Sequence, residues 1–128
     1  MPARRTPRRR PGATPLRPID LRVLPGSRAK VEAAAALAGV TSSAMVARML
    51  AWSTEHMPPE WPAAKPKRDE PPRVKLPARV SVELWERVQV DAARDGLPDA
   101  STQARRLLAY AVKKMPRDLP LHPPAPMP

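Results

Sequence analysis

Three cationic side chains alternate with apolar ones in two short stretches of the sequence. Arg22 belongs to the stretch 19–23, and Lys75 and Arg79 belong to the stretch 74–80. Alternation with a period of two is typical of a β-strand that has one buried face and one free face. A guanidinium on the free face can donate two parallel hydrogen bonds, to a phosphate or to O6 and N7 of a guanine. The two stretches therefore predict a basic strand face whose chemistry suits an anion or a base edge.

The overall charge indicates the kind of partner. The chain of 128 residues carries 23 Lys and Arg against 12 Asp and Glu, which gives a formal net charge of +11. Such an excess favours a polyanion, with nucleic acid ahead of an acidic membrane surface. Phe is absent, Tyr occurs once and Trp three times. Because single-strand binders stack bases on aromatic side chains, duplex DNA is the better expectation.

Residues suited to catalysis or metal binding are sparse. Cys is absent, which excludes disulfides and thiolate zinc sites. His56 and His122 fall at an expected helix end and in a tail, where a surface position is more common than a catalytic one. The carboxylates lie among arginines at helical spacings, as they do on solvated helix faces. We therefore expect no enzymatic activity, no cofactor and no metal.

No targeting or membrane segment is evident in the sequence. No apolar run approaches the roughly 20 residues that span a bilayer, and the start, rich in Arg and Pro, lacks the apolar centre of a signal peptide. The absence of Cys is compatible with a reducing compartment. The expectation is a cytoplasmic protein.

The prolines divide the chain into segments. The 20 prolines crowd three regions, which indicate a disordered basic arm at 1–18, a semi-rigid linker at 58–73 and a disordered tail at 116–128. Between them lie the segments 19–57 and 74–115. Each is about forty residues long, near the size below which a lone domain needs a metal, a disulfide or a partner. We expect the two segments to share one core.

The second segment repeats the first. Positions 19–39 correspond to 76–96 with an offset of 57, and after one inserted residue positions 41–58 correspond to 99–116 with an offset of 58. Matching pairs include Val31 and Val88, Ala35 and Ala92, Gly39 and Gly96, Arg48 and Arg106, and Leu50 and Leu108. A register kept over this length indicates an internal duplication.

Each copy is predicted to form a strand, a helix, a tight turn and a second helix. In the first copy Pro25 suits the first turn of a helix, and Ser27 is a candidate cap. Gly39 should end that helix, and Thr41 should cap the next one, Ser42–His56.

This order of elements resembles the ribbon-helix-helix family of bacterial, plasmid and phage DNA-binding proteins. The residues that carry the resemblance are Leu76-Pro-Ala-Arg-Val-Ser-Val-Glu-Leu-Trp-Glu-Arg-Val88 with Ala92-Ala-Arg-Asp-Gly96. The weaker twin is Ile19-Asp-Leu-Arg-Val23 with Ala38-Gly-Val-Thr-Ser-Ser-Ala-Met-Val-Ala-Arg-Met-Leu50. One copy of so degenerate a motif is a weak signal, and two in register on a basic chain are a stronger one.

The resemblance implies a mostly helical fold with a short two-stranded antiparallel ribbon, made here by two copies in one chain as an intramolecular pseudo-dimer. The ribbon's outward side chains would enter the major groove. On these positions the resemblance implies base contacts from Arg22, Arg79, Lys75 and Asp20, with Arg79 beside Arg22. Pro18 and Pro77 share the same face. Phosphates would be bound at the starts of the second helices and by the basic arm, through Thr41, Ser42, Ser43, Ser101, Thr102, Arg8, Arg9 and Arg10.

The function so implied is sequence-specific binding of double-stranded DNA, as a transcriptional repressor or as an accessory factor of a plasmid, a phage or a conjugation system. Such a protein would be encoded by a bacterium or phage and associated with the nucleoid. One alternative is a protein-partner module, such as an antitoxin whose tail 116–128 binds a toxin. A strand-exchanged dimer of two chains is an open alternative to the pseudo-dimer, and self-association on DNA is also open.

Overall fold

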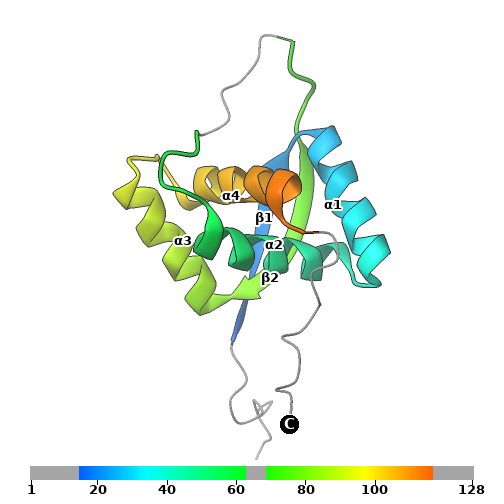
Figure 1. Ribbon diagram of the computed structural model, residues 1–128, viewed down its shortest axis with the longest axis horizontal. Helices are drawn as coiled ribbons and strands as arrows, with labels where there is room; N and C mark the ends of the chain where they lie inside the picture. Colours follow the sequence, from blue (N-terminus) through cyan, green and yellow to red (C-terminus); the bar gives the residue numbers. More distant parts are fainter. Residues whose placement is uncertain (1–14, 63–68, 117–128) are drawn as a thin grey trace, which may run out of the picture.

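The chain forms four helices and one two-stranded sheet. The computed structural model describes residues 15–62 and 69–116. The elements along the chain are β1 (Leu16–Val23), α1 (Pro25–Ala38), α2 (Ser42–His56), β2 (Val74–Ser81), α3 (Val82–Arg94) and α4 (Ala100–Lys114), as Figure 1 shows. The expected fold class, mostly helical with a short antiparallel ribbon, is confirmed. The basic-arm residues Arg8, Arg9 and Arg10 and the tail beyond Pro116 lie outside the described residues.

Local sequence sets most of the helix starts. Thr41 Oγ1 accepts a hydrogen bond from the Ala44 amide (3.1 Å), so the expected cap of α2 is confirmed. Ser81 caps α3 through the Leu84 amide (3.0 Å) in the same way. The prediction for Ser27 was wrong, because α1 already begins at Pro25 and Leu24 is its N-cap without a side-chain bond. The fixed φ of proline starts this helix in place of a side-chain cap.

Two glycines end the first helix of each copy. Gly39 and Gly96 both have φ 73°, in the left-handed region. At each of them the next amide reaches back across the helix end, from Val40 to the Ala35 carbonyl (3.0 Å) and from Leu97 to the Ala92 carbonyl (2.9 Å). This bonding pattern satisfies the last carbonyls of a helix and favours Gly, which lacks the Cβ that crowds this conformation. Gly39 therefore ends its helix as expected.

The strands β1 and β2 pair antiparallel within the one chain. Asp20 lies opposite Pro77, its counterpart 57 positions further along. On either side of this pair, Ile19 lies opposite Ala78 and Leu21 lies opposite Leu76. The offset of 57 relates Ile19 to Leu76 and Leu21 to Ala78, so these two pairs are equivalent to each other. An antiparallel ribbon whose central pair consists of equivalent residues is close to two-fold symmetric. The duplication in the sequence is thus repeated in the pairing of the strands.

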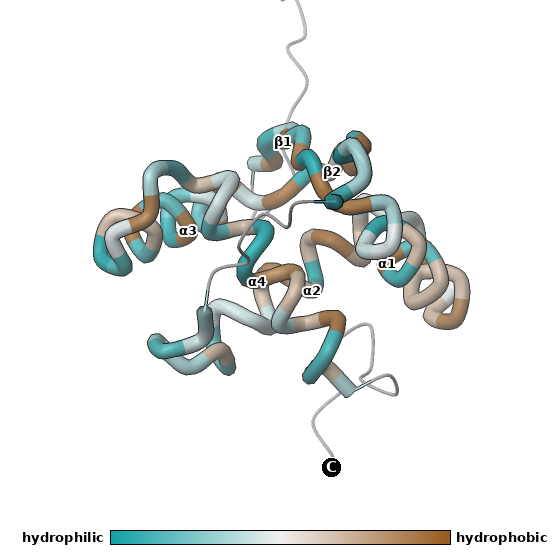
Figure 2. Tube along the Cα trace, turned by 90° about the horizontal axis from the view of Figure 1, so that it is seen from above, coloured by the Kyte–Doolittle hydropathy of each residue, from teal (hydrophilic) through white to brown (hydrophobic). Residues whose placement is uncertain are grey.

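The ribbon lies on one side of the helices. Figure 2 shows β1 and β2 together at one edge, with α1 and α3 at the flanks and α2 and α4 between them. The inner face of the ribbon and the facing sides of the helices form one core; among its residues are Ile19, Leu21, Val23, Val31, Val46, Leu50, Leu76, Val80, Trp85, Val88, Leu107 and Leu108. At the centre, the buried Ser53 hydroxyl donates to the Leu107 carbonyl (2.8 Å) and joins α2 to α4. Both copies therefore bury their apolar faces in a shared interior.

Neither a membrane-spanning helix nor a metal cluster is found in the described ranges. No single helix there is long and apolar enough to cross a membrane. Taken together, α1 and α2 have the length and composition of a membrane span, but the two helices are bent by 100° at their junction. Within residues 15–62 and 69–116, no three His, Asp or Glu side chains are grouped so that they could hold a metal ion.

Candidate nucleic-acid interface

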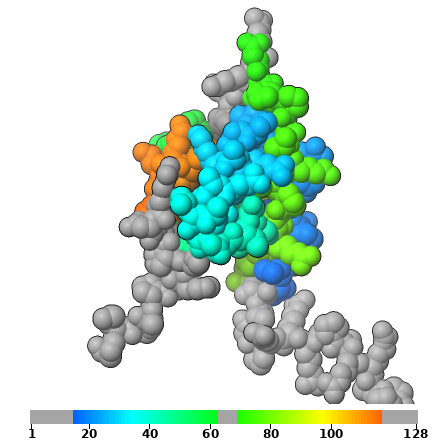
Figure 3. Space-filling model, turned by 90° about the vertical axis from the view of Figure 1, so that its right-hand side faces the viewer, coloured from blue at the N-terminus to red at the C-terminus, as the bar shows by residue number. Residues whose placement is uncertain are grey.

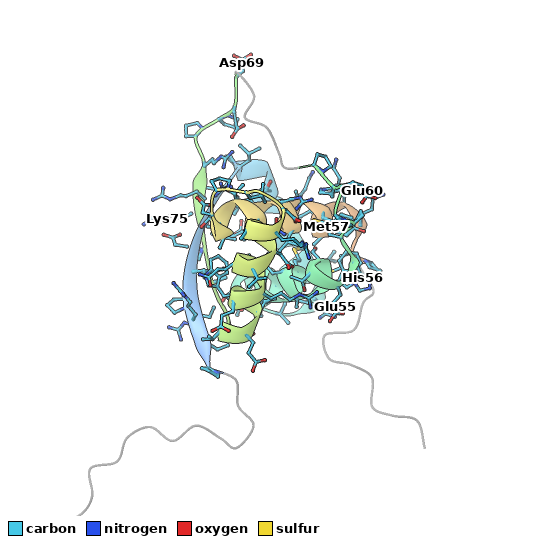
Figure 4. All side chains as sticks on the ribbon, turned by 90° about the vertical axis from the view of Figure 1, so that its left-hand side faces the viewer. Glu55, His56, Met57, Glu60, Asp69 and Lys75 are labelled. Atoms are coloured by element: carbon cyan, nitrogen blue, oxygen red, sulfur yellow. The ribbon has the colours of Figure 1, made fainter. Side chains whose placement is uncertain are left out.

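The outer face of the ribbon is exposed and carries the cations that the sequence placed there. Alternate residues of β1 and β2 are buried, and the intervening ones are exposed. The exposed residues that alternate with buried ones are Pro18, Asp20, Arg22, Lys75, Pro77 and Arg79; Leu16 and Arg17, at the start of β1, are exposed as well. Figure 4 shows the labelled Lys75 side chain extending from the ribbon away from the helices. A strip of three cations and one carboxylate is therefore open to solvent across two paired strands.

The two prolines on this face do not interrupt the strand ladder. The Arg79 amide donates to Ser43 Oγ in α2 (2.9 Å), so it points away from β1. In an antiparallel strand the amides of residues i and i−2 point the same way, so the nitrogen of Pro77 also faces away from β1. Pro18 is paired with Arg79, so the nitrogen of Pro18 likewise faces away from β2. Neither proline therefore removes a hydrogen bond between the strands.

Arg22 and Arg79 lie at opposite ends of the ribbon. The register places Arg22 opposite Lys75 and Arg79 opposite Pro18. Arg79 is four positions further along β2 than Lys75, a distance of about 14 Å. The expectation that Arg79 would lie beside Arg22 was wrong, because antiparallel pairing carries equivalent residues to opposite sides of the symmetry centre. One end of the face therefore has two cations, and the other has one cation and a proline.

Asp20 lies close to one of these cations. Its Oδ2 is 3.9 Å from Lys75 Nζ, across the strands, with the two side chains 50% and 62% exposed. An exposed pair of this kind contributes at most about 1 kcal/mol of stability and exchanges readily for other partners. Lys75 is therefore available to an incoming acceptor, at the cost of leaving Asp20 without this partner.

The start of α2 adjoins the ribbon and forms the first candidate phosphate site. Its cap residue, Thr41, is neutral and uses its side chain on the Ala44 amide. The amides of Ser42 and Ser43 precede the first intrahelical bond, which runs from Met45 to the Thr41 carbonyl (3.0 Å). Amides in this position have no acceptor within the helix and attract anions. The Ser43 hydroxyl, which accepts from the Arg79 amide, connects this helix start to the ribbon.

The start of α4 forms the corresponding site in the second copy, with a different charge. Asp99 accepts from both the hydroxyl and the amide of Thr102, each at 2.7 Å. The bond from the hydroxyl, and after it the bond from the amide, lowers the pKa of Asp99 below its ordinary value. A fixed negative charge therefore stands where a phosphate would bind. Both donors of Thr102 already serve Asp99, which leaves the Ser101 amide as the better candidate of the predicted pair.

Two arginines near this helix start were not selected from the sequence. Burial lowers the pKa of Arg105 from its ordinary value, the neighbouring charge of Arg73 lowers it further, and Asp99 raises it. Arg105 also donates to the Thr102 hydroxyl (3.2 Å). Arg105 therefore lies close to Asp99 and partly offsets its charge, whereas Arg73 is paired with Glu70, whose Oε1 accepts from Arg73 Nε at 3.0 Å. No sequence signal pointed to them, because Arg73 lies in the expected linker and the position of Arg105 in the first copy is Ala47.

The labelled acidic residues of α2 and the segment after it lie away from the ribbon. In Figure 4 Glu55 and Glu60 are on the side of the molecule opposite Lys75. Their charges therefore lie on the other side of the molecule from the cations of the ribbon face.

Comparison with protein-family models, with curated proteins and with solved structures gave no match for this chain.

Proposed function

We propose that the chain is a ribbon-helix-helix DNA-binding protein that places the outer face of its ribbon in the major groove of a duplex. The observation that carries this proposal is the exposed strip Arg22, Lys75 and Arg79 on a two-stranded ribbon, next to the start of α2. The major groove is wide enough for a two-stranded ribbon, and Arg is the side chain best suited to guanine. The net charge of +11 supplies the attraction to phosphate.

Base reading is assigned to Arg22 and Arg79 at the two ends of the face, with Lys75 opposite Arg22 and Asp20 at the centre of the register. Arg22 and Arg79 hold equivalent positions on the two strands and would contact two different half-sites. Asp20 would accept from a cytosine N4 or hold Lys75 in place. The amides of Ser42, Ser43 and Ser101 and the side chains of Thr41 and Thr102 would adjoin the phosphates, as would Arg8, Arg9 and Arg10 of the arm. Regulation of transcription, or an accessory role on a plasmid, phage or conjugation locus, follows as the biological setting.

The two copies are proposed to act as a pseudo-dimer within one chain. The pairing of β1 with β2 and the shared core support this arrangement. A tether converts association of the copies into an intramolecular step, with an effective concentration in the millimolar range. The cellular setting proposed for it is the bacterial cytoplasm and nucleoid.

The test of base reading is the loss of affinity on a selected site. Duplexes bound by the wild-type chain are first selected from a random pool, and Arg22→Ala and Arg79→Ala are then compared with wild type by fluorescence anisotropy. Each variant should raise the Kd for the selected site by about 5- to 150-fold, because one bidentate base contact is worth roughly 1–3 kcal/mol. On random DNA the change should be small.

The matched control is Lys114→Ala, which removes one exposed cation from the last turn of α4. It should weaken binding to both duplexes equally and only slightly. Equal losses on selected and random DNA for Arg22→Ala and Arg79→Ala would make these arginines phosphate contacts. If the wild-type chain binds no duplex, the protein-partner module becomes the better reading.

The pseudo-dimer is tested by sedimentation at low concentration. A folded species near the chain mass of 14.1 kDa is expected, because both strands of the ribbon come from one chain. A species of about twice that mass that persists on dilution, with the helical content retained, would indicate strand exchange between two chains instead.

A further inference from the structure

A groove runs beside α1 on one flank of the molecule. It is a cavity of about 260 Å³ between α1, α2 and the end of α4. Figure 3 faces this side, with α1 in front and the end of α4 beside it. Its walls are mostly apolar and include Leu37, Met45, Met49 and Val112. Methionine side chains adapt their shape to what they contact. The volume is below the roughly 300–1,000 Å³ of small-molecule sites and suits one or two apolar side chains.

The outer face of α1 continues this apolar wall. Leu37 lines the groove and is 75% exposed. With the offset of 57 it corresponds to Arg94 of α3, which forms ion pairs with two aspartates. Ala29 likewise corresponds to Glu86. Because α1 and α3 are equivalent flanks of the two copies, α3 shows which side chains this fold presents to water at these positions. The apolar residues of α1 therefore indicate a face that another molecule covers.

The charged residues that line the groove are all basic. They are Lys30, Arg48 and Lys113, and no carboxylate is among the lining residues that the structure describes. Arg48 already has a partner, so the attraction of the groove for a ligand is assigned to the two exposed lysines. The Lys113 ammonium lies 5.9 Å from the centre of the Trp61 ring, a long contact that does not use up its hydrogen-bond donors. The groove therefore favours an acidic ligand over a basic one.

In the second copy, a peptide segment lies over the corresponding place. After α2 the chain turns at Pro58, whose carbonyl accepts from the Trp61 amide (3.0 Å). Arg106 donates to the carbonyls of Pro59 and Trp61, both at 2.6 Å. This segment, residues 58–62, is called the strap.

The repeat relates the position of the strap to that of the groove. Arg106, which holds the strap, also donates to Asp95 at the end of α3 (2.7 Å). Arg106 and Asp95 correspond to Arg48 and Ala38, and both of these residues line the groove. An extended peptide is therefore the kind of ligand that one copy of this fold already holds at this position.

The strap combines the two features that the groove favours. Its Trp61 ring meets Tyr110 edge to face, with centroids 4.8 Å apart. The residue before Trp61 is an acid, Glu60. A large apolar side chain next to a carboxylate thus suits both the apolar wall and the basic residues of the groove.

We propose that the α1 groove binds an acidic peptide segment of another protein, with one large apolar side chain beside a carboxylate. The apolar side chain packs against Leu37 and Met49, and the carboxylate pairs with Lys30 or Lys113. A second copy of this chain is a poorer occupant, because its net charge of +11 repels the same basic residues. No residue of the ribbon's outer face lines the groove, so the proposal does not depend on DNA binding.

The test uses the full-length chain with carbon-13 in its methionine methyl groups. The probe is a synthetic peptide with the strap sequence Met57-Pro-Pro-Glu-Trp-Pro62 and blocked ends. Its addition should shift the signals of Met45 and Met49, which line the groove, and leave that of the chain's own Met57 unchanged. The same peptide with Glu60→Lys should bind at least about fivefold more weakly, because its charge is reversed.

The first variant tests the apolar wall. Leu37→Arg gives α1 the residue that α3 carries at the equivalent position, and the exposure of Leu37 means that the fold should be retained. The affinity for the probe should fall about tenfold, because an apolar contact is lost. The matched control is Ala36→Arg, at an exposed neighbour that does not line the groove. The same added charge should there leave the affinity unchanged or slightly higher.

The second variant tests the charge. Lys30→Gln should weaken binding of the probe roughly two- to fivefold at low salt, the effect of one exposed ion pair. Lys114→Gln removes an exposed cation that does not line the groove and should change the affinity less.

Four results would overturn the proposal. The first is no shift of Met45 and Met49 at probe concentrations up to about 1 mM, and the second is equal affinity for the two peptides. The third is an unchanged affinity in Leu37→Arg. The fourth is a shift of Met45 and Met49 that appears without peptide as the protein concentration rises and is lost in Leu37→Arg, since the groove would then hold a second copy.

Discussion

At the scale of single residues, the two candidate phosphate sites differ by one charge. Thr41 caps α2 with a neutral hydroxyl, and Asp99 caps α4 with a carboxylate whose pKa is lowered by its bonds from Thr102. A capping carboxylate stabilises its own helix start. The same charge repels a phosphate that approaches the amides beside it. The second copy therefore gains helix stability at the expense of anion affinity.

Asp99→Asn should strengthen duplex binding. Asn is as good a cap as Asp, so the helix start is retained while the negative charge is removed. We expect the Kd to fall roughly two- to fivefold at low salt, the effect of about 0.3–1 kcal/mol near a helix end, and the gain to shrink as salt rises. Anisotropy titrations at several salt concentrations measure both effects.

The matched control is Glu55→Gln, which removes one exposed carboxylate on the side of the molecule opposite the ribbon (Figure 4). It should leave the Kd nearly unchanged. A gain equal to that of Asp99→Asn would show that only the net charge matters, and no gain from Asp99→Asn would place the start of α4 away from the phosphates.

At the scale of elements, the glycine turns decide where the first helix of each copy ends. Both Gly39 and Gly96 have φ 73°, and a Cβ at either would meet no atom within 4 Å. Gly is therefore required at these positions because of the positive φ angle, and not because a side chain would collide with other atoms. Each turn sets the direction in which the second helix leaves, and so sets the place of its capped start.

Gly39→Ala and Gly96→Ala should each lower the free energy of unfolding by about 1–2 kcal/mol, the strain of a left-handed Ala. Gly26→Ala is the matched control, because Gly26 lies in the first turn of α1 and its Cβ would also meet nothing. There Ala should raise stability by up to about 1 kcal/mol. Urea unfolding measures all three, and a destabilised Gly26→Ala would contradict this account.

At the scale of the whole molecule, the single chain makes the two ends of the ribbon's outer face unequal. A dimer of identical chains would present the same residues at both ends, whereas here one end has Arg22 opposite Lys75 and the other has Arg79 opposite Pro18. We therefore expect a target site whose two halves differ in sequence, since the half-sites of a DNA-binding dimer mirror the symmetry of the protein.

The double variant Pro18→Lys with Asp20→Pro should change that preference. It gives both strands the outward sequence Lys, Pro, Arg, and the backbone nitrogen at position 20 faces away from β2, so proline is compatible with the ladder. Selection from a random pool should then yield inverted repeats with two equal half-sites. Selection of the original unequal site by this variant would argue that the ribbon face does not determine the sequence that is bound.

Much of this fold follows from local patterns in the chain. Alternation in 19–23 and 74–80 predicted both strands and their exposed residues, Gly39 and Thr41 predicted where helices end and begin, and the repeat predicted a common core. These signals are local because each depends on backbone geometry within a few residues. Ser27 shows that such local patterns can mislead, because this candidate cap residue lies inside a helix that begins earlier, at Pro25.

What only the tertiary structure decided is which residues of the two copies come together. The register carried Arg22 and Arg79 to opposite ends of the ribbon and directed the nitrogen of Pro77 away from the partner strand. None of these contacts is encoded in a local pattern, because each depends on how two segments separated by a linker are aligned. The sequence by itself determined the elements and the faces they expose, and the packing of one copy against the other decided the shape of the site.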